Sequence, residues 1–281
     1  MLTVLEVVKK TSEFFTSRAI ESPRLNAELL VGHVLGLPRM RLYLEFERAL
    51  SDAELASVRE LVRRRGRREP LQHILGHADF FGLRLKTDRR ALIPRPETEL
   101  LVETIVARIG APPGRILDLG TGSGAIALAL ASAFPAARVT AVDSSAEALA
   151  LAAENAASTG LSERVRFALS DWLGGLARGE AFDLVVSNPP YLSQEETAAA
   201  APEVREHEPA GSLTAADGGF SELERIARAS PGALAPGGML ALETGTGHHA
   251  RLASVLREAG FTRSESVADL AGRDRFVLAW L

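Results

Sequence analysis

The four residues Asn188-Pro189-Pro190-Tyr191 hold the most distinctive chemistry in this sequence. They follow residues 182–187, a short apolar run that predicts a buried strand. Neither proline has a backbone N–H, so the turn offers a substrate carbonyl oxygens without donors, and Asn188 adds a side-chain carbonyl. Two acceptors and the flat ring of Tyr191 suit a planar, uncharged NH2 group, such as an amide or an arylamine. The alternative interpretation is an ordinary Pro-Pro turn that leaves a strand.

A glycine-rich turn upstream is the candidate site for the electrophile. It lies between a strand predicted at 116–119 and a helix predicted at 126–134, and it reads Gly120-Thr121-Gly122-Ser123-Gly124. Glycines permit a positive φ and let a ligand lie against the backbone at a helix N-terminus. The pattern also fits the relaxed dinucleotide motif of dehydrogenases, and an ordinary tight turn is the plainer alternative.

Acidic residues near this turn indicate which cofactor it would hold. Asp143 ends a strand predicted at 138–143, about 20 residues past the glycines, which is the spacing of a carboxylate that accepts both ribose hydroxyls. Asp118, just before the first glycine, favours a cofactor with an ammonium group over one with a pyrophosphate. S-adenosylmethionine has that ammonium group and no phosphate. A helix cap is the alternative role for Asp143.

A third predicted strand, at 164–169, is followed by Asp171 and Trp172. In a nucleotide-binding α/β sheet the end of this strand reaches the base of a bound nucleoside. Asp171 could therefore accept from an adenine amino group, and Trp172 could pack on the ring. The alternative is a core tryptophan beside a solvated acid. All these strand ends converge on the crevice where open α/β sheets bind ligands.

The elements that must position these residues predict an α/β fold, with a Rossmann-like sheet and helices on both faces. Before residue 78 the patterns are only helical, with capping boxes that pair Thr3 with Glu6 and Ser51 with Glu54. We therefore expect a small all-helical domain at 1–78, a β-hairpin linker at 79–95 and the α/β domain at 96–281.

Composition excludes several kinds of site. The 281-residue chain has no cysteine, hence no disulfide, thiolate zinc site or cysteine nucleophile, and its six histidines show no metal-type spacing. We expect no metal. No signal peptide is evident, and no run reaches the eighteen or so apolar residues that span a bilayer. The sequence therefore predicts a soluble, cytoplasmic protein that binds no membrane.

Charge is divided unevenly along the chain. Residues 1–83 hold 13 Lys/Arg and 11 Asp/Glu, whereas the remainder holds 19 and 25. The acidic second part is a poor partner for a nucleic-acid duplex, so we expect no direct DNA binding. The exception is the run 63–68, which contains five arginines. It is either the solvated end of a helix, favoured by the helix dipole, or a docking patch for an acidic partner.

A family resemblance extends from about residue 72 to the end of the chain. The residues that carry it are the segments 72–76, 93–99, 117–124, 188–191 and 270–275. The chain resembles the protein-glutamine N5-methyltransferases that modify peptide chain release factors. The resemblance implies a class I methyltransferase domain at 96–281, S-adenosylmethionine as co-substrate, and the glutamine of the Gly-Gly-Gln tripeptide in class 1 release factors as substrate. It also implies that residues 1–78 form a domain that recognises the release factor. We expect the enzyme to be a monomer.

These expectations assign roles to individual residues. Asn188 Oδ1 and the Pro189 carbonyl would each accept one N–H of the substrate amide, and Tyr191 would pack on the amide plane, which orients the nitrogen for direct in-line transfer. We predict catalytic roles for Asn188, Pro189, Pro190 and Tyr191. We predict cofactor binding by Gly120, Thr121, Gly122, Ser123, Gly124, Asp143, Asp171, Trp172 and Asn188. The role of 243–249, where the chain departs from the family pattern, stays open.

Three other functions compete with this one. An adenine-N6 methyltransferase acting on DNA or RNA would use the same Asn-Pro-Pro-Tyr turn, but it would need a basic face and a target-recognition insertion. A Rossmann-like module without activity would not need an intact site. A nicotinamide dehydrogenase would need a His, Lys or Tyr for hydride chemistry at the position of Asn188.

Overall fold

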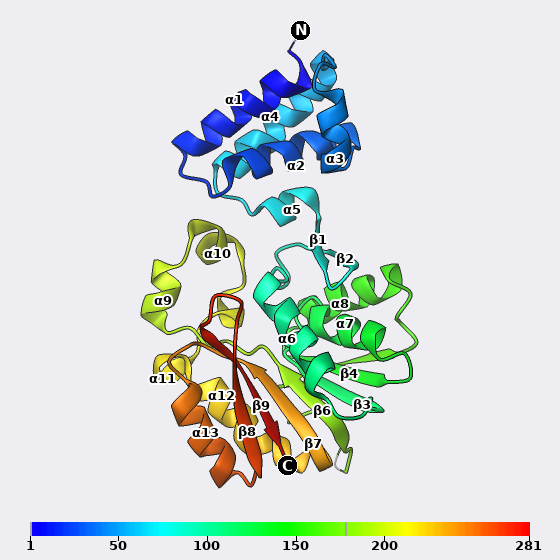
Figure 1. The fold of residues 1–281 in the computed structure, drawn as a ribbon, viewed down its shortest axis with the longest axis vertical. Helices are drawn as coiled ribbons and strands as arrows, with labels where there is room; N and C mark the ends of the chain where they lie inside the picture. The colour runs from blue at the N-terminus through cyan, green and yellow to red at the C-terminus, as the bar shows by residue number, and fades with distance from the viewer. Residues whose placement is uncertain (1, 178) are drawn as a thin grey trace. The chain divides into compact units, whose positions relative to one another are not determined.

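A computed structural model describes residues 2–177 and 179–281. The chain forms two compact units (Figure 1). The first comprises Met1–Gly76 together with Pro202–His207, and the second comprises His77–Ala201 together with Glu208–Leu281. Within the described residues, no helix combines the length and the apolar character needed to cross a membrane.

The first unit is helical, as the sequence predicts. Both capping boxes form: Thr3 with Glu6, and Ser51 with Glu54. The apolar sides of the helices bury Phe15, Leu30 and Leu42 completely, among other residues, in one core. Its α-helices are α1 (Val4–Ser17), α2 (Pro23–Leu35), α3 (Arg39–Leu42), α4 (Asp52–Gly66), α5 (Leu71–Leu75) and α10 (Pro202–His207), with a 3-10 turn at Tyr43–Glu45.

The arginine run at the end of α4 is largely engaged inside this unit. Arg65 is only 5% exposed; its Nε donates to Asn26 Oδ1 at 2.8 Å and its Nη2 to Glu203 Oε1, on α10, at 2.9 Å. Arg68 approaches the same Glu203 oxygen at 3.3 Å, and Arg64 pairs with Glu69. The run is therefore neither a wholly solvated helix end nor a free patch, because α10 covers part of it.

The second unit is built on a seven-stranded sheet with the order β5-β4-β3-β6-β7-β9-β8. The first five strands of that order are parallel, and β9 is antiparallel to both its neighbours. A separate antiparallel hairpin joins β1 (His77–Phe80) to β2 (Leu83–Lys86). The sheet strands are β3 (Arg115–Leu119), β4 (Arg138–Asp143), β5 (Val165–Leu169), β6 (Phe182–Ser187), β7 (Leu234–Glu243), β8 (Arg263–Ala268) and β9 (Asp274–Trp280).

Helices cover both faces of the sheet, which confirms the predicted fold class (Figure 1). Successive strand side chains point to opposite faces, so Ile116 joins one core and Leu117 the other. One core packs against α6 (Pro96–Arg108), α7 (Ala125–Ala133) and α8 (Ala146–Ser158). The other packs against α12 (Ser221–Ala229) and α13 (His249–Glu258), and the shorter α9 (Gln194–Ala199) and α11 (Ala216–Gly219) lie in the segment after β6.

The strand order explains where a ligand site forms. From β3 the chain runs outward to β4 and β5, then returns to place β6 on the other side of β3. Connections leave in opposite directions at this switch point, which opens a crevice at the carboxyl ends of the strands. Ser187 Oγ donates to the Leu119 carbonyl at 2.7 Å and ties the ends of β6 and β3 together, one residue before Asn188.

Candidate active site

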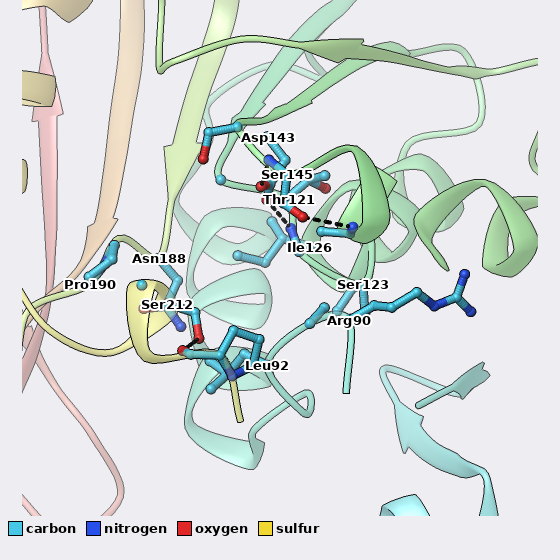
Figure 2. A pocket seen from close by; sticks show the side chains of 18 of the residues that line it. Arg90, Leu92, Thr121, Ser123, Ile126, Asp143, Ser145, Asn188, Pro190 and Ser212 are labelled. Atoms are coloured by element: carbon cyan, nitrogen blue, oxygen red, sulfur yellow. Dashed lines mark hydrogen bonds between the residues drawn. The ribbon is translucent and has the colours of Figure 1, made fainter. Parts of the chain in front are cut away.

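A pocket of about 490 Å³ lies at the carboxyl ends of β3, β4, β5 and β6, a size typical of small-molecule sites (Figure 2). Nine of the predicted site residues line it: Gly120, Thr121, Gly122, Ser123, Asp143, Asp171, Trp172, Asn188 and Pro190. Among the described residues, Gly124, Pro189 and Tyr191 are the predicted ones that do not. Figure 2 shows Asn188, Pro190 and Ser212 at one end of the pocket and Asp143 and Ser145 at another.

The glycine turn forms one wall, and its shape requires glycine. Gly120 has a φ of 72°, and a Cβ added there would lie 3.1 Å from Trp172 Cζ3. The backbone N–H groups of Gly120 and Thr121 both donate to the Val142 carbonyl at 2.9 Å, which anchors the turn on β4. The turn is therefore a fixed surface against which a flat ligand can lie.

Asp118 lies beneath this turn, with no exposed surface. Its Oδ2 accepts from Thr121 Oγ1 at 2.6 Å and from the Ala127 N–H at 3.1 Å, whereas its Oδ1 has no hydrogen-bond partner. Burial raises the pKa of Asp118 to about 7. Asp118 does not line the pocket, so its contribution to choosing an ammonium-bearing cofactor stays a prediction.

Asp143 reaches the pocket from the end of β4. Its Oδ2 accepts from the Gly122 N–H and its Oδ1 from the Ser145 N–H, both at 2.9 Å. The side-chain cap of α8 is supplied by Ser145, whose Oγ accepts from the Ala148 N–H at 3.2 Å. Each carboxylate oxygen of Asp143 keeps a further lone pair for a ligand hydroxyl.

Asp171 and Trp172 both line the pocket, and both have partners on α12. Arg225 binds the exposed Asp171 carboxylate with two hydrogen bonds, of 3.0 and 2.5 Å, and lowers the pKa of Asp171. Trp172 Nε1 donates to Glu222 Oε2 at 2.6 Å, and its backbone has a φ of 49°. The interpretation as a core tryptophan beside a solvated acid does not describe this pair, because Asp171 is salt-bridged to Arg225 and Trp172 lines the pocket. Their contacts with a nucleoside base stay a prediction.

Asn188 belongs to a chain of hydrogen bonds that starts at the pocket wall, where Asn188 and Thr98 both line the pocket, and ends at Glu243 and Tyr191. Its Nδ2 donates to Thr98 Oγ1 at 3.0 Å, and Thr98 Oγ1 donates to Glu243 Oε2 at 2.8 Å. Tyr191 OH donates to the other oxygen, Glu243 Oε1, at 3.0 Å. Glu243 is 2% exposed, and burial raises its pKa. Burial, followed by the charge of Glu243, raises the pKa of Tyr191 as well.

Comparison with known proteins identifies the family. Residues 6–76 match the family described as the PrmC N-terminal domain, and residues 96–207 match the methyltransferase small domain. A release factor glutamine methyltransferase of Chlorobaculum tepidum is 47% identical over 250 residues, which cover 86% of this chain and 85% of the relative. Its counterpart in Deinococcus radiodurans is 42% identical over 277 residues, covering 98% and 97%.

The chain belongs to the release factor glutamine methyltransferase family. It is thus an S-adenosylmethionine-dependent protein-glutamine methyltransferase, as the resemblance implied. Solved structures agree on the fold. The hMettl16 catalytic domain in complex with MAT2A 3'UTR hairpin 6 superimposes with a TM-score of 0.57, at 19% identity and 82% coverage of both chains. A Pyrococcus furiosus methyltransferase gives 0.54 at 18% identity, over 71% of this chain and 89% of its own.

Several residues of this methyltransferase site were not predicted from the sequence. Thr98 lies in a segment that carries the family resemblance but gave no sign of contacting Asn188, and Glu243 opens the segment whose role was left open. Arg225 and Glu222 reach the pocket from α12. These residues become partners only when distant segments pack together, and a local sequence motif does not indicate which segments will do so.

A segment after the Asn-Pro-Pro-Tyr turn closes the pocket near Asn188. The chain at 209–214 contributes Pro209, Gly211, Ser212 and Thr214 to the lining. Arg95 Nη2 holds its start by donating to both oxygens of Glu208, at 2.6 and 2.8 Å. The Glu208 side chain is 1% exposed, and burial raises its pKa despite the pairing.

Across the part of the chain that the structure describes, no three His, Asp or Glu side chains come together as a metal site would require. The pocket instead offers backbone groups, carboxylates and apolar walls, which suit a nucleoside.

Proposed function

We propose that this enzyme transfers the methyl group of S-adenosylmethionine to the side-chain N5 of the glutamine in the Gly-Gly-Gln tripeptide of class 1 release factors. The observation that carries the proposal is the position and bonding of Asn188. Its Nδ2 is engaged with Thr98, so its Oδ1 is the atom left to accept a hydrogen bond at the pocket. An acceptor there is what an amide NH2 requires. The names of the relatives support a release factor as the protein that carries this amide.

The residues of the pocket fit S-adenosylmethionine. We propose that Asp143 accepts the two ribose hydroxyls, because its carboxylate lines the pocket at the end of β4. The glycine turn 120–124 would lie against the cofactor, with Trp172 beside the adenine ring. Asp171 would accept the adenine amino group while it keeps its salt bridge to Arg225, since a carboxylate has about four acceptor sites. When bound, the cofactor supplies an electrophilic methyl group.

The protein's part in the reaction is mainly positioning. An amide nitrogen is a weak nucleophile because its lone pair is delocalised into the carbonyl group. In the proposal, Asn188 Oδ1 and the carbonyl of Pro189, a residue next to the pocket lining, each accept one N–H, which orients the nitrogen and stabilises its developing positive charge. The new N–C bond forms as the S–C bond breaks, and the nitrogen then loses a proton to water. Correct placement of two reactants can lower a barrier by several kcal/mol.

The structure refines the proposed role of Tyr191. Its hydroxyl is fixed by Glu243, and its ring packs at the edge of the second core. Tyr191 would thus support the turn from behind, and contact with the amide plane would need the substrate to reach beyond the present pocket lining. Pro190 lines the pocket directly and offers its ring as an apolar wall.

We propose further that the domain at 1–78 recognises the release factor away from its glutamine. The match of residues 6–76 to a domain named for this family supports such a role. A release factor as substrate would place the reaction in the cytoplasm, and a monomer would suffice, since every proposed site residue comes from one chain. The adenine-N6 alternative finds no specific support, because the likeness to a catalytic domain in complex with a 3'UTR hairpin, at 19% identity, concerns the fold alone.

The test is a transfer assay with radiolabelled S-adenosylmethionine. The substrates are an unmodified class 1 release factor, the same factor with Gln→Ala in its Gly-Gly-Gln tripeptide, duplex DNA and a structured RNA. We expect label on the first factor only, and none from an Asn188→Ala enzyme. Label on a nucleic acid but not on the release factor would overturn the proposed substrate. Equal label on the Gln→Ala factor would overturn the proposed glutamine.

A further inference from the structure

Four polar side chains form one hydrogen-bonded unit at the edge of the pocket, which Thr98 and Asn188 line. Thr98 lies in the first turn of α6, Glu243 ends β7, and Asn188 and Tyr191 follow β6. The bonds run from Asn188 Nδ2 to Thr98 Oγ1, from Thr98 Oγ1 to Glu243 Oε2, and from Tyr191 OH to Glu243 Oε1. Thr98 is 5% exposed and Glu243 is 2% exposed, so the bond between them is shielded from water.

The direction of every bond in this unit follows from Glu243 in its ionised form. An ionised carboxylate can only accept, so the single hydroxyl proton of Thr98 is directed to Glu243. The Thr98 oxygen is then left with lone pairs only, and it must accept from whichever end of the Asn188 amide faces it. That end is the NH2 group, and the oxygen of the amide is turned away from Thr98.

This direction matters because the two ends of an asparagine amide are nearly the same shape and opposite in hydrogen bonding. With Oδ1 towards the pocket, Asn188 offers an acceptor to an incoming NH2 group. With the amide flipped, two N–H donors would face two N–H donors, and the substrate amide would be repelled. A flip of about 180° therefore reverses the chemistry of the site without changing its shape.

We propose that Thr98 and Glu243 are positioning residues that lock the Asn188 side-chain amide with Oδ1 towards the acceptor nitrogen. The proposal rests on the proposed function, because it assumes an amide NH2 as the acceptor. In the proposal both residues act through Asn188: Thr98 lines the pocket beside it, and Glu243 does not line the pocket. Tyr191 belongs to the same unit, because its hydroxyl satisfies the second oxygen of Glu243.

The burial of Glu243 favours this role over a purely structural one. A buried carboxyl is costly to desolvate, and well-packed apolar residues often stabilise a core equally well. Around Glu243 lie Thr98 and Glu97 on α6, Tyr191, and Arg275 on β9. Burial raises the pKa of Glu243, and the hydrogen bonds from Thr98 and Tyr191, followed by the charge of Arg275, act in the opposite direction. Both hydroxyl groups donate to the carboxylate, which fixes the direction of the bonds in the ionised form of Glu243.

Substitutions at Thr98 separate the hydroxyl from the shape of the side chain. Thr98→Val removes the hydroxyl that links Asn188 to Glu243 and keeps the volume of the side chain, whereas Thr98→Ser keeps the hydroxyl. The matched control is Thr140→Val, which removes the hydroxyl of a buried threonine on β4, outside this hydrogen-bonded unit. We measure kcat and KM for the release factor, and the Kd of S-adenosylmethionine by calorimetry. We expect kcat to fall about 100-fold in Thr98→Val, as for a misaligned reactant, and Thr98→Ser to stay within a few-fold of wild type.

The distribution of the effect distinguishes positioning from structure. A positioning role predicts that the Kd of S-adenosylmethionine and the unfolding transition of Thr98→Val stay close to those of Thr140→Val while kcat falls. Glu243→Met serves as a second variant with the same expected fall in kcat, because it removes the carboxylate that accepts the Thr98 proton. If Thr98→Val does not fold, the Glu243 variant tests the positioning role by itself.

The outcomes for this inference and for the proposed function can be told apart. If wild-type enzyme leaves the release-factor glutamine unmodified, the proposed function fails before any variant is compared. If wild type modifies it and a folded Thr98→Val or Glu243→Met enzyme keeps the wild-type kcat, the positioning role is contradicted. A loss of kcat that is matched by an equal loss of cofactor affinity would also contradict it, since the defect would then be structural.

Discussion

Two buried carboxyl groups, Asp118 and Glu243, set the properties of the site at the scale of single residues. Asp118 supports the glycine turn through Thr121 and the Ala127 N–H, and Glu243 supports the Asn-Pro-Pro-Tyr turn through Thr98 and Tyr191. The two motifs that face the ligands thus each rest on one acid that does not line the pocket. Because burial raises the pKa of both acids, each takes up its proton at a higher pH than an exposed acid would.

Asp118 should make stability depend on pH. The pKa of an unfolded aspartate is about 3.9, whereas burial raises that of Asp118 to about 7 in the folded protein. Between these values the folded state holds a proton that the unfolded state releases. The stabilising contribution is therefore fully present below about pH 4 and is lost as pH rises to about 7, by up to about 4 kcal/mol.

Asp118→Asn removes this proton and keeps the shape of the side chain. The difference in unfolding free energy between wild type and Asp118→Asn, measured by denaturant titration, should change in favour of the variant as pH rises from about 4 to about 7. Above pH 8 it should stay constant. A difference that does not vary across this range would show that Asp118 is ionised at ordinary pH despite its burial.

At the scale of elements, the sheet brings together what the sequence separates. The ends of β3, β4, β5 and β6 were predicted to converge because each carries its motif locally, as a glycine turn, an acid or an Asn-Pro-Pro-Tyr turn. The structure brings these motifs to one pocket. The partners of the motifs could not be predicted, since Thr98 and Glu243 are 145 positions apart and Asp171 and Arg225 are 54 apart. Only the packing of helices against the sheet selects such pairs.

The glycine turn offers a prediction for the element that would hold the cofactor. Gly120→Ala places a methyl group about 3 Å from the Trp172 ring in a backbone region that disfavours side chains. We expect a loss of about 1 to 2 kcal/mol in unfolding free energy and a weaker Kd for S-adenosylmethionine. Gly110→Ala, where an added Cβ meets no atom within 4 Å, is the control. If Gly120→Ala binds S-adenosylmethionine as tightly as the Gly110→Ala control does, the glycine turn is not part of the cofactor site.

At the scale of the whole molecule, the first compact unit is made of two separate stretches of the chain, whereas the sequence suggests a single one. The predicted boundaries at 78 and 95 treat the helical domain as one N-terminal block. The structure instead assigns Pro202–His207 to the first unit, because Glu203 on α10 binds Arg65 and Arg68 there. A charge run such as 63–68 gives no sign of which acid will bury one of its members, so this assignment was beyond prediction. The β-hairpin at 77–86 falls in the second unit.

The different burial of the arginines gives a prediction for the first unit. Arg65→Met leaves Glu203 and Asn26 without their buried donor and should lower the unfolding free energy by about 2 to 4 kcal/mol. Arg63→Met, at an exposed position that pairs with Glu60, should change it by no more than about 0.5 kcal/mol. Thermal unfolding of the two variants gives the comparison. Equal effects would mean that the bonds of Arg65 contribute nothing beyond a surface ion pair.

The account as a whole depends on where the methyl group goes. The most direct measurement is fragmentation mass spectrometry of a class 1 release factor after incubation with the enzyme and S-adenosylmethionine. We predict one added methyl group, localised to the side-chain amide of the glutamine in Gly-Gly-Gln, and its absence when Asn188→Ala enzyme is used. A methyl group on any other residue, or an unmodified glutamine beside an enzyme that has bound its cofactor, would contradict the account.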